Sequence, residues 1–380
     1  MPYGAKTLGL ALSGGGFRAT LFGLGSLWRL NELGLLSALD RITSVSGGSI
    51  LAGYLGYKWR ALRFSHGIAQ NFADEVVSPL RQFCIQTIDT PSGIKGILSP
   101  FRSAGDFLTS RYDKDLFHKA TLRDLPIGPS ASNASMGPDF VIYATNMQTG
   151  RSFRFTQEYV ADYYLGINRT AAIPLACAVA ASSAFPPIFS PIKLETNPQG
   201  WEGGTLKQDD LRNLQRKIVL ADGGVYDNMG LEALLHRDKA TAKNHFDIVL
   251  VSDAGAPFEI ISSPWGDYIS QLARVRNILI DQTRALRKQY FVEDLAANRR
   301  SGAYWGIGTA IDDYSIPALT KDSPTTESLK SVRTRLNAFS PEEQGQLINW
   351  GYALADAAIR KYVIPTAPAA TQWPVPAFSL

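Results

Sequence analysis

Three glycine-rich segments of this sequence carry residue types that can perform acyl-transfer chemistry. The first is the segment 43–49, Thr-Ser-Val-Ser-Gly-Gly-Ser, in which a predicted strand leads into Ser46 and a predicted helix leaves it. This pattern is typical of a nucleophile elbow, a strained strand-to-helix turn that exposes a serine hydroxyl above a sheet. Small residues are needed two positions to either side of the serine, and here they are Ser44 and Gly48. Ser44 stands where glycine is commoner, and a Ser-Gly-Gly-Ser turn alone is more often an ordinary loop.

The second segment, Ser-Gly-Gly-Gly-Phe-Arg-Ala at 13–19, also lies between a predicted strand and a predicted helix. Its glycines expose backbone N–H groups at a helix N-terminus, where the helix dipole favours negative charge. Such a loop suits either a phosphate group or the oxyanion of a tetrahedral acyl intermediate. Arg18 opposes the dipole in the first helical turn. It is therefore either a tolerated surface cation or a residue that shapes the loop or supports the oxyanion.

A dinucleotide-binding domain is the alternative from another class of function. The glycine loop matches the Rossmann fingerprint as Gly14-x-Gly16-x-x-Ala19. That fingerprint requires an acidic residue at the end of the second strand, whereas the corresponding strand here, residues 41–45, leads to Ser46. No Gly-Lys-Ser/Thr sequence follows the loop, so a P-loop fits less well.

The third segment, residues 220–230, contains Asp222 followed by two glycines. Asp222 ends an apolar predicted strand, so we expect its carboxylate at the carboxyl edge of the sheet, where Ser46 also emerges. Histidine is the usual base for a serine nucleophile, but none of the histidines follows a strand in a glycine-rich turn; they are His66, His118, His236 and His245. A Ser46–Asp222 dyad therefore fits better than a triad, with burial raising the aspartate pKa above its ordinary value near 4.

Apolar strands and helices alternate in the first half of the chain, the pattern of a largely parallel sheet covered by helices. The expected strands are 7–12, 41–45, 140–146, 152–155, 217–221 and 247–252, and the expected helices are 17–33, 47–59, 175–184, 231–236, 267–291 and 340–362. The last helix begins with a capping-box signature, Ser340 with Glu343.

We expect a single domain over residues 1–364, with a core at about 5–260, a C-terminal helical part at 261–364 and an extended Pro/Ala tail at 365–380. The segment 62–126 is rich in phenylalanine and interrupts the alternation of strands and helices. It either shapes an acyl pocket or packs in the core.

The composition narrows the class of function. With 45% hydrophobic and 19% charged residues the chain can bury a large core. Its net charge of +4 is scattered rather than clustered, so we expect no nucleic-acid partner, while weak peripheral contact with an anionic membrane surface stays open. Two cysteines make no disulfide framework, and the absence of any metal-ligand spacing predicts no metal or organic cofactor.

We expect a protein that is cytoplasmic or peripheral at a membrane. The apolar run ahead of Ser13 is too short for a signal peptide. The segment 170–192 carries no charge and is long enough to span a bilayer. Its four prolines would break a spanning helix, however, so a buried helix followed by a proline turn is the prediction.

Taken in order, the three glycine-rich segments resemble those of the patatin-like phospholipases of bacterial type, a family related to cytosolic phospholipase A2. The segments Arg-Tyr-Asp-Lys-Asp-Leu-Phe at 111–117, Ala-Thr-Asn-Met-Gln-Thr-Gly at 144–150 and Ala-Ala-Ser-Ser-Ala-Phe-Pro-Pro at 180–187 are also similar to bacterial members. The resemblance covers about residues 8–255. It implies a three-layer α/β/α sandwich with a largely parallel central sheet.

The resemblance also implies a serine acyl hydrolase that cleaves fatty-acyl esters of phospholipids or related lipids without a cofactor. Ser46 becomes the nucleophile and Asp222 its only protein partner, and an acyl-enzyme intermediate forms on the Ser46 oxygen. The oxyanion loop consists of Gly14, Gly15, Gly16 and Arg18. The sequence departs from many members at Ser44 and Ala19, which stand in place of glycine. An inactive or scaffolding member of the same fold remains the alternative, and the oligomeric state is not predicted.

Overall fold

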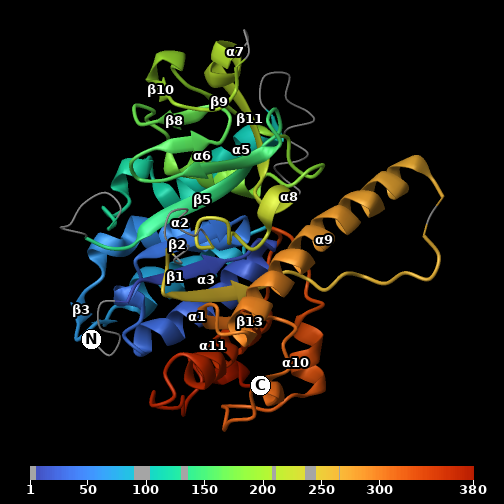
Figure 1. Cartoon of the computed structure of the whole chain (residues 1–380). Helices are drawn as coiled ribbons and strands as arrows, with labels where there is room; N and C mark the ends of the chain where they lie inside the picture. Colours follow the sequence, from blue (N-terminus) through green and yellow to red (C-terminus); the bar gives the residue numbers. More distant parts are fainter. Residues whose placement is uncertain (1–5, 90–102, 130–135, 208–210, 236–244, 265) are drawn as a thin grey trace.

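A computed structural model describes residues 6–89, 103–129, 136–207, 211–235, 245–264 and 266–380 (Figure 1). Its centre is an eleven-stranded sheet in which five neighbouring strands run parallel. In spatial order these are β5 (Asp139–Asn146), β2 (Arg41–Val45), β1 (Leu8–Leu12), β12 (Ile248–Asp253) and β13 (Ser301–Gly306). Nearly all of their residues are buried, as expected for parallel strands that are covered on both faces.

Antiparallel strands extend the sheet beyond β5. They are β6 (Arg151–Phe155), β7 (Val160–Asp162), β8 (Gly166–Asn168) and β10 (Trp201–Glu202). Two further strands, β9 (Ile192–Glu195) and β11 (Lys217–Asp222), pair with each other, and β11 also pairs with β5. The sheet is therefore mixed around a parallel centre, which confirms the predicted fold class.

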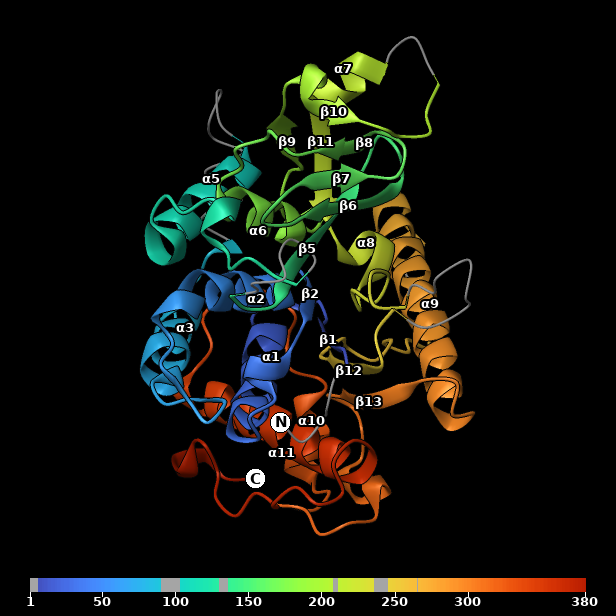
Figure 2. The same ribbon diagram turned by 60° about the vertical axis from the view of Figure 1, so that its left-hand side comes forward.

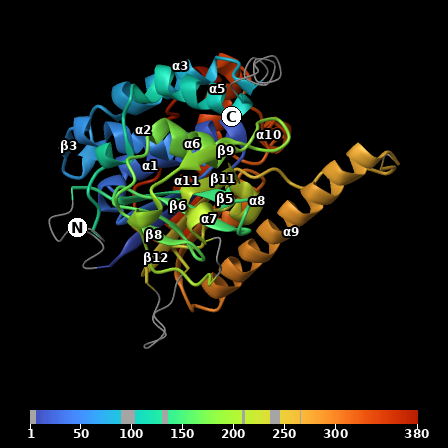
Figure 3. The ribbon, with the colours of Figure 1, turned by 90° about the horizontal axis from the view of Figure 1, so that it is seen from above.

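Helices cover both faces of the sheet (Figures 2 and 3). The first face packs against α1 (Gly16–Glu32), α2 (Gly47–Lys58), α6 (Leu175–Ser183) and α11 (Pro341–Tyr362). The second face packs against the turns after α8 (Gly224–Asp227) and the C-terminal end of α9 (Tyr268–Ala296). Residues of β1 divide between the two layers, since Leu10 lies in the first cluster and Ala11 in the second.

Helices α1 and α11 pack backbone to backbone. A Cβ atom added to Gly25 would lie 1.9 Å from the carbonyl oxygen of Ile348, and one added to Gly351 would lie 1.9 Å from that of Phe22. Each position therefore requires glycine. A buried ion pair of 2.7 Å between Arg29 and Asp356 fixes the same contact.

The strands and most of the helices expected from the sequence are present, with boundaries shifted by at most five residues. The helix predicted at 231–236 is wrong. Residues 231–235 form turns, residue 236 lies outside the described residues, and the short helix of this region is α8. The Asp227 carboxylate accepts hydrogen bonds from the N–H groups of Met229, Leu231 and Glu232, which holds the turns after α8 in place of a helix.

The phenylalanine-rich segment 62–126 packs largely in the core. Phe72, Phe83 and Phe117 are buried there and none of them lines the cavity described below, while Phe101 lies outside the described residues. The segment contains the strands β3 (Phe64–Ser65) and β4 (Ile68–Ala69) and the helices α3 (Ser78–Cys84) and α5 (Ala104–Tyr112).

The C-terminal part joins the same body. It contributes the edge strand β13, the helix α11 and the short helix α10 (Pro324–Leu329). The short helix α7 (Leu211–Arg216) belongs to the antiparallel part and lies at the far end of the molecule, beside β9–β11 (Figure 1). The tail returns to α11, where the Asn349 side chain donates hydrogen bonds to the carbonyl groups of Val375 and Phe378.

Candidate active site

Strands β2 and β11 meet end to end along one edge of β5. Val45 of β2 pairs with Tyr143 of β5, and Asp222 of β11 pairs with the next residue, Ala144. Because β6 occupies the other edge of β5 at both positions, β2 and β11 must share an edge. Both strands point their carboxyl ends at this junction, but they run in opposite directions. Ser46 and Asp222 therefore arrive from opposite sides rather than from neighbouring parallel strands.

Ser46 occupies a strained turn between β2 and α2. Its backbone has φ 51° and ψ −119°, a conformation that non-glycine residues rarely adopt outside functional turns. The Ser46 N–H donates to the Ser182 hydroxyl at 2.9 Å. A Cβ atom on Gly47 would lie 1.9 Å from the carbonyl oxygen of Gly16, so the start of α2 lies directly against the glycine loop.

Asp222 is a buried carboxyl group with few partners. Its Oδ1 accepts a hydrogen bond of 2.7 Å from the Gly224 N–H, and the Ser46 side chain lines the same cavity. Burial raises the pKa of Asp222 to about 7, against the opposing effects of the Gly224 N–H and of the Ser46 hydroxyl. A carboxyl group with this pKa can accept a proton near neutral pH and release it again.

The three glycines of the loop 14–16 differ in their hydrogen bonding. The Gly14 N–H donates to the carbonyl of Asn228 at 2.9 Å. Within the described part of the chain, the amides of Gly15 and Gly16 have no such partner. Since α1 begins at Gly16 and α2 at Gly47, two helix N-termini meet beside the Ser46 side chain. The site thus favours negative charge next to the hydroxyl.

Arg18 is buried and bonded to backbone carbonyl groups. Its guanidinium donates to Ala254 at 2.5 and 3.1 Å, to Val332 at 2.7 Å and to Lys330 at 3.3 Å. Burial lowers the pKa of Arg18 to about 10, with Arg284 acting in the same direction. These contacts join the start of α1 to the end of β12 and to the C-terminal part of the chain. Arg18 is therefore not a tolerated surface cation, and its contacts favour a role in shaping the glycine loop.

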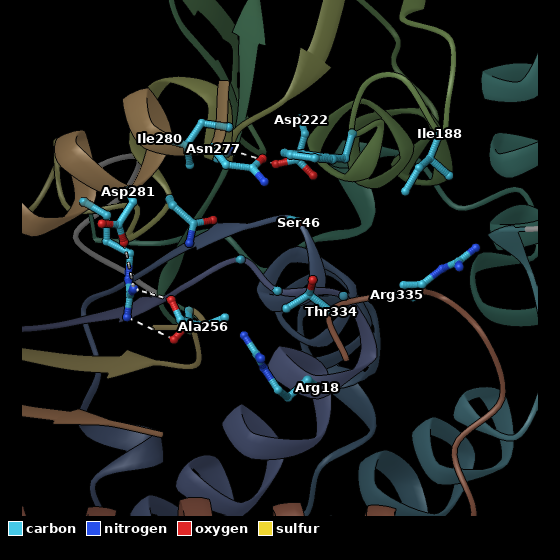
Figure 4. Close-up of a pocket in the computed structure, with 18 of the residues that line it drawn as sticks. Arg18, Ser46, Ile188, Asp222, Ala256, Asn277, Ile280, Asp281, Thr334 and Arg335 are labelled. Atoms are coloured by element: carbon cyan, nitrogen blue, oxygen red, sulfur yellow. Dashed lines mark hydrogen bonds and ion pairs between the residues drawn. The ribbon is translucent and has the colours of Figure 1, made fainter. Parts of the chain in front are cut away.

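These residues line one cavity of about 470 Å³ (Figure 4). Asp222 lies near Ser46, while Asn277 and Ile280 of α9 lie on one side of the cavity and Ile188 on the opposite side (Figure 4). All the residues predicted for the site are among its lining: Gly14, Gly15, Gly16, Arg18, Ser46 and Asp222. The structure therefore brings the three glycine-rich segments together.

None of the histidines in the described ranges lines the cavity. His66 and His118 are exposed. His245 precedes β12 and so lies at the end of the parallel strands that is opposite to Ser46, while residue 236 is outside the described residues.

Several lining residues had no signal in the sequence. Asn228 lies in the third glycine-rich segment, yet nothing in its type or spacing pointed to the cavity. The segment 334–336 lines it from the C-terminal part of the chain, and Arg335 accepts a hydrogen bond from the Phe17 N–H and forms an ion pair of 2.8 Å with Asp89. Such contacts between distant segments leave no local pattern.

Over the described residues, every helix is too short or too polar to cross a membrane. The uncharged segment 170–192 contains the nine-residue helix α6, most of whose residues are buried in the core.

The fold and the site define a class of protein: an α/β fold that holds a serine on a strand-to-helix turn beside a buried carboxylate. A model of the patatin-like phospholipase family matches residues 10–235, which is more than half of the chain. The chain therefore belongs to the patatin-like phospholipase family. This assignment replaces the dinucleotide-binding alternative and supports lipid acyl hydrolase activity.

Solved structures similar to this chain include human GIVD cytosolic phospholipase A2, with a TM-score of 0.50, 11% identity, and coverage of 94% of this chain and 59% of that one. The same human protein in complex with methyl gamma-linolenyl fluorophosphonate inhibitor and terbium chloride gives a TM-score of 0.51, 13% identity, and coverage of 94% and 58%. The chain thus spans less than two thirds of that protein's solved chain, and the likeness concerns the fold. No curated protein sequence matches this chain.

Proposed function

We propose that this protein is a phospholipase A-type carboxylic ester hydrolase that uses a Ser46–Asp222 dyad. The observation that supports it most is the junction on β5, which brings a serine on a strained turn together with a buried carboxyl group whose pKa lies at about 7. The solved structure of the human phospholipase A2 with a fluorophosphonate inhibitor is consistent with serine chemistry on this fold.

In the proposed mechanism, Asp222 accepts the hydroxyl proton of Ser46 as its oxygen attacks the ester carbonyl carbon. The amides of Gly15 and Gly16 stabilise the resulting oxyanion, because they are the loop amides without another partner. Gly14 and Arg18 contribute to the oxyanion loop by holding its shape. The leaving alcohol takes the proton from Asp222, and an acyl-enzyme remains.

Hydrolysis of the acyl-enzyme repeats the same steps with water. Asp222 accepts a proton from the water that attacks the acyl carbon, and collapse of the intermediate releases the fatty acid and returns the proton to Ser46. The cavity suits an acyl chain because apolar side chains line it, including Phe185, Ile188 and Phe189.

The test is hydrolysis of a short p-nitrophenyl ester together with labelling by a fluorophosphonate probe. We expect Ser46→Ala to abolish both, and Asp222→Asn to lower kcat/KM by about a thousandfold or more while the fold persists. Ser183→Ala is the matched control, because Ser183 lines the same cavity and its hydroxyl donates to the Val179 carbonyl.

The pH dependence adds a second readout. Since the base must be deprotonated, kcat/KM should rise with pH through about 7, the pKa of Asp222. Full activity of either dyad variant would remove the assignment. A natural protein that is neither labelled nor active would instead be the inactive or scaffolding member of the family.

A further inference from the structure

Helix α9 exposes an apolar stripe along most of its length. The stripe residues follow one another at spacings of three, four or seven, which places them in one line on the helix. With their exposed fractions they are Tyr268 (76%), Leu272 (53%), Val275 (52%), Leu279 (57%), Leu286 (47%) and Tyr290 (65%). In this helix of 29 residues only Phe291 is buried. An apolar surface of this extent indicates that something covers it.

The opposite face of α9 attaches the helix to the body through charged residues. Arg284 forms an ion pair of 2.8 Å with the buried Asp253 at the end of β12. Arg287 lies 3.5 Å from the carboxylate of Asp227. The usual arrangement of a surface helix is thereby reversed, since Arg284 and Arg287 face the protein and the apolar side chains of the stripe face outward. The body of the protein cannot cover the stripe.

The charge of α9 indicates the kind of surface that covers it. Between Tyr268 and Tyr290 the helix contains the cations Arg274, Arg276, Arg284, Arg287 and Lys288 but a single acid, Asp281. Asp281 lies 3.9 Å from Arg284, and among the described residues no carboxylate pairs with Arg274 or Arg276. Two copies of this face would bring two helices of the same net positive charge together, whereas an anionic lipid surface complements that charge.

The position of α9 connects the stripe to the cavity. Arg274, Arg276 and Ile280 line the cavity from the same helix, and Ile188 lines it from the loop after α6. Ile260, in the segment before α9, is 93% exposed. Figures 1 and 3 show that α9 extends outward beyond the sheet. A surface that contacts the stripe would therefore lie at the edge of the cavity.

We propose that the outward face of α9 is the surface on which this protein docks to an anionic lipid bilayer. The apolar stripe enters the interface, and the net positive charge of the helix attracts acidic head groups. The identity of the partner as a lipid rests on the proposed function, because the substrate of the neighbouring cavity is a lipid ester.

The test measures vesicle binding separately from catalysis. The full chain carrying Ser46→Ala is mixed with vesicles of phosphatidylcholine alone or of phosphatidylcholine with phosphatidylglycerol, and the bound fraction is measured by flotation. The stripe variant adds Leu272→Gln, Leu279→Gln and Leu286→Gln. The matched control adds Met147→Gln, Tyr163→Gln and Ile167→Gln, which are exposed large apolar residues on the antiparallel extension of the sheet.

We expect the stripe variant to partition to the anionic vesicles at least about tenfold less, and the control to change by less than about twofold. Binding should be weaker on phosphatidylcholine alone and should fall with added salt. With Ser46 present, all variants should hydrolyse a short soluble ester equally, since the stripe residues do not line the cavity.

Equal partitioning of the stripe variant and its parent would overturn the proposal, as would equal binding to neutral and anionic vesicles. A dimer that the stripe variant abolishes, without vesicle binding by the parent, would assign the face to a second copy. Stripe-dependent vesicle binding by a protein that hydrolyses no ester would contradict the proposed function and leave the docking surface in place.

Discussion

Helices α1 and α9 both border the cavity, yet they are built in opposite ways. In α1, 15 of 17 residues are buried, and its backbone touches that of α11. In α9, one residue of 29 is buried, and Arg284 and Arg287 join the helix to the body through ion pairs. The comparison shows that the two sides of one cavity are attached to the protein in different ways. Close packing fixes α1 and the glycine loop on one side of the cavity. On the other side, most residues of α9 are exposed, so substitutions there should change the stability of the protein little.

The largest contrast is expected in stability. Gly25→Ala should lower the free energy of unfolding by about 3 kcal/mol or more, because the new methyl group overlaps a carbonyl oxygen of α11. Gly266→Ala, just before α9, should change it by less than about 0.5 kcal/mol, since its Cβ would meet open space. Urea unfolding followed by tryptophan fluorescence measures both. Equal effects would mean that the two helices are not packed as differently as described.

A second contrast concerns the arginines of the two helices. Arg18→Met should cost about 2–3 kcal/mol of stability, because the carbonyl groups of Ala254 and Val332 lose their buried donor. It should also lower kcat/KM about tenfold or more by loosening the loop. Arg274→Met on α9 serves as the control and should change the free energy of unfolding by less than about 0.5 kcal/mol. A stable Arg18→Met protein with normal activity would contradict the loop-shaping role.

The smallest effect concerns the buried carboxyl group of Asp222, at the end of β11. Because the pKa of Asp222 is raised from 3.8 to about 7, the folded state binds a proton that the unfolded state has released between these pH values. The contribution of Asp222 to stability therefore falls as pH rises from about 4 to 7. Asp222→Asn should stabilise the protein by about 1–3 kcal/mol at pH 8 and by much less near pH 4.

The matched control on α9 is Asp281→Asn, whose partly exposed carboxylate lies 3.9 Å from Arg284. Its effect should stay below about 0.5 kcal/mol at either pH. Thermal unfolding of the three proteins at both pH values provides the measurement. A destabilising effect of Asp222→Asn at pH 8 would contradict the free-energy cost of ionising this buried carboxyl group that its raised pKa indicates.

Much of the fold could be predicted from the sequence because the central strands are long apolar runs bounded by turns. The segment at 41–45 followed by Ser46 illustrates this, since the apolar pattern and the small residues are local. The direction of β11 could not be predicted. Its apolar residues look the same whether it pairs parallel or antiparallel, and only pairing with β5 and β9 decides this.

The site was predictable only as far as its motifs extend. Each glycine-rich segment predicts a turn after a strand, so Ser46, Asp222 and the loop 14–16 could be predicted as site residues. The contact of Arg335 with the start of α1 joins residues more than 300 positions apart, and no local pattern encodes it. Likewise, the helical periodicity of α9 indicates an apolar stripe, but it does not indicate whether this stripe faces the body of the protein or the solvent.

The end-to-end meeting of β2 and β11 also bears on how such a protein can change over evolution. The spacing of hydroxyl and carboxylate is set by two consecutive residues of β5, Tyr143 and Ala144. Turns that lie away from this junction can lengthen without altering that spacing. Lineages that insert or delete residues around Gly150, between β5 and β6, or around Gly203, after β10, would therefore keep the spacing of Ser46 and Asp222 unchanged.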